Sequence, residues 1–297
     1  MANGCAAIAM DWQGARPQFL TPPFDSIREP LGHLIEDTDW PSIARLNSIA
    51  TGIKNFRGRQ IRFVANEEAL NAMHYETRIA ETGEIATRDN WHDLFNAMSW
   101  LAFPHAKSAI SEMHSRLLHV HGENEARERS APRDVLTLFD EGGIIITSSD
   151  QSLLELVRRF EWKALFVKRR AEVMTRMRFH LFGHSMLEKA LDPYVGVTAK
   201  AILLFVDDAF LESSQTKQIH HVDQRATDWL LDESNLSSSR NFSPLPWLGV
   251  PGWWQQSESP AFYDNTHYFR RGRTQNPPAQ VAASLSPRER GTEGEGA

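Results

Sequence analysis

Two groups of polar residues have the types and spacing that chemistry requires. The first contains His92, Asp93 and Asn96, with Arg88 just upstream. On a helix, His92 and Asn96 lie one turn apart on the same face. An imidazole beside a carboxylate and an amide can bind a metal ion or act as a general base. We therefore treat these three as candidate catalytic residues and Arg88 as a candidate substrate-binding residue. The competing interpretation is structural: Asn90 would cap the helix and Asp93 would favour its dipole.

The second group is His180, His184 and Glu188, spaced by four residues each time. On a single helix the three side chains share one stripe. This makes His184 and Glu188 candidate ligands of a divalent metal ion. Two features count against a zinc peptidase helix: Leu181 stands where that motif needs a glutamate, and ligands spread over two turns reach one tetrahedral ion poorly. The alternative is a buried His184 with Glu188 as its charge partner.

Other segments give weaker chemical signals. Residues 244–268 are rich in proline and tryptophan, and Trp253 and Trp254 are candidate substrate-binding residues, although such a strap can also simply cover the core. Several Arg and Lys residues lie near the second group in the sequence. They could together bind an anion, but we favour the interpretation that they form a solvent-exposed helix face. These residues are Arg169, Arg170, Arg176, Arg178, Lys189 and Lys200. No nucleophile elbow, phosphate-binding loop or dinucleotide fingerprint is present.

The elements that must position these residues follow from apolar periodicity, caps and turns. Helices are expected at 37–50, 90–102, 104–118, 150–160, 168–191, 198–206 and 216–231. A strand is expected at 60–64, and β-hairpins at 75–87 and 135–147. The predicted fold class is α+β: mostly helical with short β-hairpins, and with no βαβ repeat that would argue for a parallel sheet.

Composition excludes several classes of protein. The chain has 297 residues, a net charge of -6 and a single cysteine, Cys5. One cysteine cannot form a disulfide framework or an all-cysteine metal site. The acidic balance argues against nucleic acid as a partner, and the absence of a long apolar run argues against the membrane. We expect a cytoplasmic protein without a secretory signal, and the sequence leaves open whether its partner is a small molecule or a protein.

Composition shifts suggest five segments along the chain. They are an N-terminal extension at 1–35, an N-terminal part at 36–118, a linker or surface loop at 119–132, a C-terminal helical part at 133–273 and a disordered tail at 274–297. The two central parts can also form a single domain.

Ordered motifs across most of the chain are similar to those of a known family. They lie at residues 75–76, 87–97, 133–141, 182–191, 193–200 and 244–264. The sequence resembles the bacterial domain-of-unknown-function family 3025, and this resemblance implies no mechanism. Two positions depart from the family pattern: His105-Ala106 stands in place of Arg-Thr, and His180 in place of an aromatic residue.

Two hypotheses for the function result. In the first, the protein is a hydrolase, with or without a divalent metal ion, that uses His92, Asp93, Asn96, His184 and Glu188 around one cleft. It predicts that the two polar groups converge to contacts of roughly 3 Å. In the second, the protein is a non-catalytic interaction or regulatory protein in which the same residues are structural.

Overall fold

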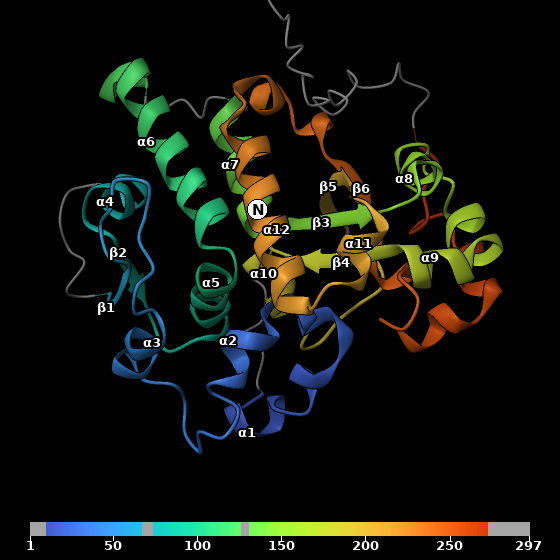
Figure 1. Ribbon diagram of the computed structural model, residues 1–297, viewed down its shortest axis with the longest axis horizontal. Coiled ribbons are helices and arrows are strands. Elements are labelled where there is room, and N and C mark those ends of the chain that lie inside the picture. Colours follow the sequence, from blue (N-terminus) through green and yellow to red (C-terminus); the bar gives the residue numbers. More distant parts are fainter. Residues whose placement is uncertain (1–9, 67–73, 126–130, 273–297) are drawn as a thin grey trace, which may run out of the picture.

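Two small sheets organise the helices of this chain (Figure 1). The computed structural model describes residues 10–66, 74–125 and 131–272. The strands are β1 (Arg62–Ala65), β2 (Glu84–Thr87), β3 (Gly143–Ser148), β4 (Met177–Leu181), β5 (Ala199–Phe205) and β6 (Ser243–Leu245). The helices are α1 (Trp12–Ala15), α2 (Arg28–Gly32), α3 (Ile43–Ile49), α4 (Tyr75–Thr82), α5 (Trp91–Ala102), α6 (Pro104–Glu125), α7 (Ala131–Gly142), α8 (Gln151–Arg158), α9 (Arg170–Arg176), α10 (His184–Lys189), α11 (Asp208–Glu212) and α12 (Gln215–Leu231).

The larger sheet is mixed and has the strand order β4-β3-β5-β6. Strand β3 is parallel to β5 and antiparallel to β4, and β5 is antiparallel to β6. The smaller sheet contains β1 and β2, which run parallel and are joined through α4. The parallel pairs therefore belong to separate sheets and do not form a doubly wound sheet.

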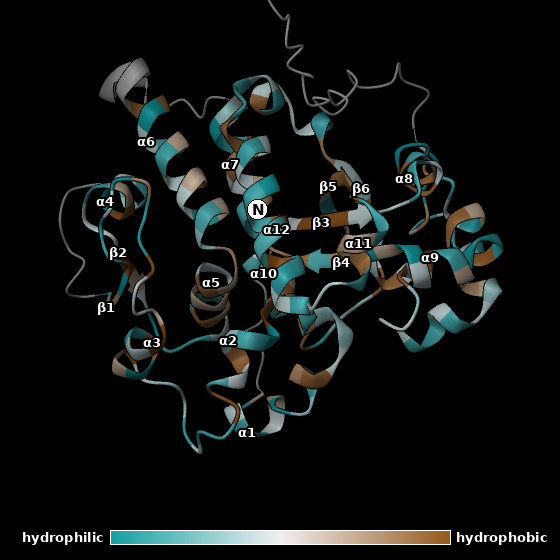
Figure 2. Cartoon of the chain, viewed as in Figure 1, coloured by the Kyte–Doolittle hydropathy of each residue, from teal (hydrophilic) through white to brown (hydrophobic). Residues whose placement is uncertain are grey.

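Alternate residues of β3 face two different apolar cores. Ile144 and Ile146 belong to a large core that also contains aromatic residues of the N-terminal segment and of 244–269. Ile145 faces a second core beneath α6, α7 and α12. Successive side chains of a strand point to opposite faces of the sheet, so this alternation is expected of a strand that has an apolar core on each face. Figure 2 shows a brown, apolar stretch in β3, and every residue of this strand is buried.

The mostly helical α+β class is confirmed, as are the helices at 90–102 and 216–231. Both predicted hairpins are wrong. Residues 75–82 form α4, and Gly83, with φ +77°, ends that helix. Residues 131–142 form α7, which buries Val135, Leu136 and Phe139 on one face. In both places a helix leads into a strand, so the turn signal marks a helix end.

Two further predictions fail between residues 168 and 206. The long helix at 168–191 is divided into α9, strand β4 and α10. The helix at 198–206 is strand β5, which lies between β3 and β6. A buried strand has a continuous apolar run, and periodicity alone cannot separate such a run from a buried helix.

One apolar core joins segments that composition had separated. Phe24 of the N-terminal extension stacks on Phe95 of α5 at 5.7 Å, and both belong to the same core as Leu187 of α10. Helix α6 continues to Glu125, inside the expected linker. The expected tail at 274–297 lies outside the described residues. Within the described part of the chain, every helix is too short or too polar to serve as a membrane span.

Two buried histidines make stability depend on pH. Burial lowers the pKa of His114 to about 4 and that of His180 to about 3. Below pH ~6.5 the unfolded chain takes up protons that the folded chain does not accept until pH 4 or 3, so the free energy of unfolding falls as pH falls. Each histidine contributes at most about 3 kcal/mol of this loss by pH 4. Urea unfolding at pH 7 and pH 4 should show a smaller loss for His180→Phe than for the wild type. An equal loss would contradict the prediction.

Candidate metal centre

The register of β3 and β4 places Glu141 opposite His184. In this antiparallel pair Ile144 lies opposite Leu181. Continuing the same register by three residues from this pair brings Glu141, near the end of α7, opposite His184, the first residue of α10. The two chain segments lie close together here, because the backbone N–H groups of Phe182 and Gly183 both donate to the carbonyl of Gly143, at 3.1 and 2.9 Å.

His92 reaches the same point from α5. The side chain of Asn90 accepts a hydrogen bond from the backbone N–H of Asp93 at 2.8 Å and caps this helix, as predicted. His92 is the second residue of α5, and α5 packs against α10. Three different elements therefore contribute one side chain each.

The three side chains form a triangle of ligand atoms. His92 Nε2 lies 3.1 Å from His184 Nε2, and Glu141 Oε1 lies 3.9 Å from His92 Nε2 and 3.6 Å from His184 Nε2. A point equidistant from these atoms in their plane is about 2.1 Å from each, which matches zinc–nitrogen and zinc–oxygen distances of ~2.0–2.2 Å. Among the described residues, no other group of three His, Cys, Asp or Glu side chains converges in this way.

A carboxylate lies near the Nδ1 atom of each of the two imidazoles. His92 Nδ1 lies 3.1 Å from Glu188 Oε2, and His184 Nδ1 lies 3.6 Å from Asp140 Oδ2. The His92–Glu188 contact is typical of metal-binding histidines, whose second nitrogen donates to a carboxylate, whereas the 3.6 Å between His184 Nδ1 and Asp140 is too long for a hydrogen bond. If both Nδ1 atoms carry their protons toward these carboxylates, both Nε2 lone pairs and Glu141 Oε1 face one another. Three facing acceptors repel unless a proton or a metal cation lies between them.

The electrostatics of the cluster show that it attracts positive charge. The hydrogen bond with Glu188 raises the pKa of His92. Burial raises the pKa of Glu141, but a hydrogen bond from protonated His184 and the positive charges of His184 and His92 lower it to about 2. The Glu141 carboxylate is therefore ionised and available as a ligand at neutral pH.

One side of the cluster is open to solvent. The side chains of His92 and Glu141 are 35% and 43% exposed, whereas that of His184 is 5% exposed. A small molecule can therefore approach from the side of His92 and Glu141.

The two polar groups predicted from the sequence converge, because His92 contacts both His184 and Glu188 at 3.1 Å. Their members have different surroundings. Asp93 accepts two hydrogen bonds from the guanidinium of Arg88, at 2.8 and 3.0 Å. Asn96 accepts from Lys107 Nζ at 2.8 Å and donates to the hydroxyl of Tyr75 at 3.1 Å. His180 lies on β4, so it does not share a helix stripe with His184.

Sequence reasoning missed the residues that complete the cluster. The predicted hairpin at 135–147 places Glu141 in its turn, although the segment containing Glu141 carries the family resemblance. Asp140 pairs with Lys107, a lysine that is only 3% exposed. The chain Asn96–Lys107–Asp140–His184 thus links the first predicted group to the cluster through buried polar contacts.

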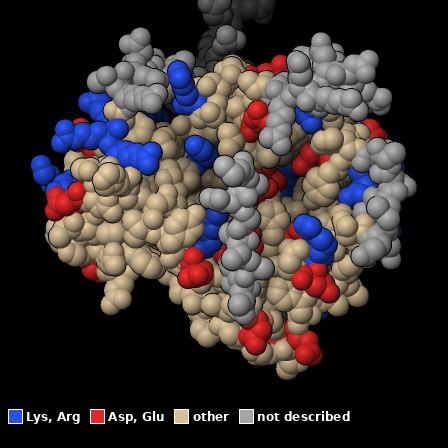
Figure 3. Space-filling view, turned by 180° about the vertical axis from the view of Figure 1, so that it is seen from behind, with Lys and Arg blue, Asp and Glu red and all other residues tan. Residues whose placement is uncertain are grey.

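The remaining sequence candidates lie elsewhere. Lys and Arg side chains gather on the left flank in Figure 3, the side of α8 and α9 in Figure 1. Arg169 pairs with Asp150 there, and Arg170 pairs with Glu258, as expected of a solvated helix face. Trp253 lines a cavity whose lining includes none of the metal-ligand cluster, that is, of His92, Glu141 and His184.

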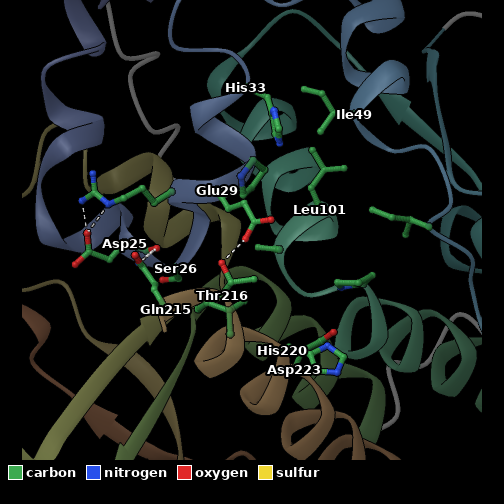
Figure 4. A pocket seen from close by; sticks show the side chains of 16 residues that line it. Asp25, Ser26, Glu29, His33, Ile49, Leu101, Gln215, Thr216, His220 and Asp223 are labelled. Atoms are coloured by element: carbon green, nitrogen blue, oxygen red, sulfur yellow. Dashed lines mark hydrogen bonds and ion pairs between the residues drawn. The ribbon is translucent and has the colours of Figure 1, made fainter. Parts of the chain in front are cut away.

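Two cavities of about 400 Å³ each lie away from the cluster. In the first, shown in Figure 4, Thr216 donates to Glu29 at 2.9 Å, and His33 and His220 line the space nearby. Asp223, also in its lining, accepts from the backbone N–H groups of His105 and Ala106 and so anchors the start of α6. These carboxylates already have partners, so His92, Glu141 and His184 remain the candidate metal ligands.

The carboxylate of Glu188 offers a test of the second coordination shell. Glu188→Gln removes the ionised acceptor of His92 Nδ1, and outer-shell changes of this kind lower metal affinity by about 10–100-fold. Competition with a chromogenic chelator measures the zinc affinity. Glu172→Gln on α9 is the matched control, and equal affinities of the two variants would argue against a metal at the cluster.

Comparison with known proteins identifies the family. Searches of curated proteins and of solved structures found no match to the chain. The model of a family described as "Protein of unknown function (DUF3025)" matches residues 61–273, a range that includes His92, Glu141 and His184. The chain therefore belongs to this family of proteins of unknown function.

Proposed function

We propose that this protein is a metal-dependent hydrolase in which His92, Glu141 and His184 hold one divalent transition-metal ion. The observation that supports this best is the convergence of three ligand atoms, 3.1–3.9 Å apart, from α5, α7 and α10. Two imidazoles and one carboxylate form a known catalytic zinc site. Iron(II) accepts the same set, so the identity of the metal must be measured.

The chemistry follows from the open side of the cluster. Three protein ligands leave a coordination position for water, and a bound zinc ion lowers the pKa of that water to ~7 and polarises a carbonyl or phosphoryl oxygen. Glu188 orients the imidazole of His92, and Asp140 places a carboxylate 3.6 Å from Nδ1 of His184. The exposed sides of His92 and Glu141 give substrate access to this position.

The competing proposal is a non-catalytic protein in which the same residues brace the junction of α5, α7 and α10. The buried Lys107–Asp140 pair favours it, since such a pair restricts how neighbouring helices pack. In this proposal a bound metal ion would be structural, and no substrate would be turned over.

Elemental analysis and hydrolysis assays distinguish the proposals. Untagged protein should retain close to one equivalent of metal and should hydrolyse at least one of three probes: p-nitrophenyl acetate, bis(p-nitrophenyl) phosphate or a mixed peptide substrate. Chelation should abolish turnover, and added zinc, manganese or iron should restore it. Glu141→Gln should lose both metal and turnover, while Glu172→Gln should retain both. Metal without turnover supports the structural proposal, and failure to bind any of these metals overturns both metal proposals.

A further inference from the structure

The cavity lined by Trp253 has an apolar wall and a cationic end. Its apolar lining includes Val173, Met174, Met177, Phe179, Val250 and Trp253. The rings of Phe179 and Trp253 are 6.1 Å apart at an angle of 70°. Such a corner accepts a flat aromatic group stacked on one ring and edge-on to the other, and the flexible methionines adapt to its outline.

Arg178 supplies the charge at this cavity. Its Nη1 donates to the backbone carbonyls of Met177 and Thr175, at 2.8 and 3.3 Å. Among the described residues, no Asp or Glu forms an ion pair with Arg178. The acidic residue in the lining, Asp25, pairs with Arg28. The guanidinium therefore has donors available for an anion, and a carboxylate matches its planar geometry.

A buried polar side chain lines the same cavity. His180 is 6% exposed, and its Nε2 has one long contact, 3.5 Å from the hydroxyl of Thr147. Gln218, 7% exposed, donates to the backbone carbonyls of Leu211 and Ser213. An apolar body with a few polar groups at one end is the usual composition of a small-molecule site, and about 400 Å³ lies in the usual size range.

We infer that this cavity binds a small aromatic carboxylate, with the ring system against Trp253 and Phe179 and the carboxylate on Arg178. The site is separate from the metal-ligand cluster and does not depend on the proposed hydrolysis. Trp253 lines the site, whereas Trp254 is not among its lining residues.

Isothermal titration calorimetry with matched probes tests the inference on the full chain. The probes are 2-naphthoate and its neutral counterpart 2-naphthalenemethanol. We expect 2-naphthoate to bind at least about tenfold more tightly than the alcohol, because a charge-assisted hydrogen bond is worth about that factor or more. Arg178→Gln should remove this difference without changing the affinity for the alcohol. Arg176→Gln, an exposed arginine two residues away, should leave both affinities unchanged.

A second variant tests the contribution of the apolar wall to binding. Trp253→Ala should weaken both probes by a similar factor, with an unchanged far-UV circular dichroism spectrum as the check on folding. Absence of 2-naphthoate binding up to millimolar concentration would overturn the inference. Equal binding by Arg178→Gln and the wild type would also overturn it. Decanoate binding in place of 2-naphthoate would overturn the aromatic assignment.

Discussion

Replacing His184 by alanine is expected to lower the zinc affinity of the protein by about 100-fold or more, beyond the range expected for outer-shell changes. His184 is the most buried of the three candidate ligands and lies within 3.6 Å of both others. Without it, His92 and Glu141 remain as two ligands 3.9 Å apart on separate helices. Two ligands from separate elements hold an ion far less tightly than three.

Zinc affinity is measured on metal-stripped protein by competition with a chromogenic chelator. His220→Ala is the matched control, because this exposed histidine contacts Gln224 and lies outside the cluster. Glu141→Gln provides a second variant whose partly exposed side chain should not disturb folding. Wild-type affinity in both His184→Ala and Glu141→Gln would refute the metal site.

Local signals explain what the sequence predicts correctly. The Asn90 cap and α5 depend on residues within one or two helical turns, and the structure confirms both. The grouping of His92 with His184 and Glu188 was inferred from residue chemistry, and the observed contacts confirm that they converge. A histidine on the first turn of a capped helix is positioned by its immediate neighbours, which is why it could be found.

Glu141 could not be found in this way, because its position depends on strand register. The Gly142-Gly143 pair resembles a hairpin turn, but Gly143 begins a strand that pairs with β4 some 35 residues away. The four-residue spacing of His180, His184 and Glu188 suggested one helix and concealed β4. With β4 unrecognised, no local pattern places Glu141 opposite His184.

Gly183→Ala is the second change with a large expected effect. A Cβ atom at this position would lie 2.5 Å from the carbonyl oxygen of Glu141 and 2.5 Å from the backbone nitrogen of Gly143. Both contacts are with backbone, so a flexible side chain cannot move aside to relieve them. The strand ends must separate, and we expect a loss of about 3 kcal/mol in the free energy of unfolding. For a chain of this size that corresponds to a fall in Tm of roughly 5 °C.

The same separation should weaken metal binding, because Gly183 holds the chain segments that carry Glu141 and His184 next to each other. Gly142→Ala is a close control: a Cβ there meets no atom within 4 Å, although it lies one residue from Glu141. We expect Gly142→Ala to keep the wild-type Tm and zinc affinity, whereas Gly183→Ala loses both. Thermal unfolding and chelator competition on the two variants measure these quantities. If Gly183→Ala lost stability but kept its zinc affinity, the spacing of these two segments would not control the metal centre, since metal binding responds directly to the ligand spacing and global stability does not.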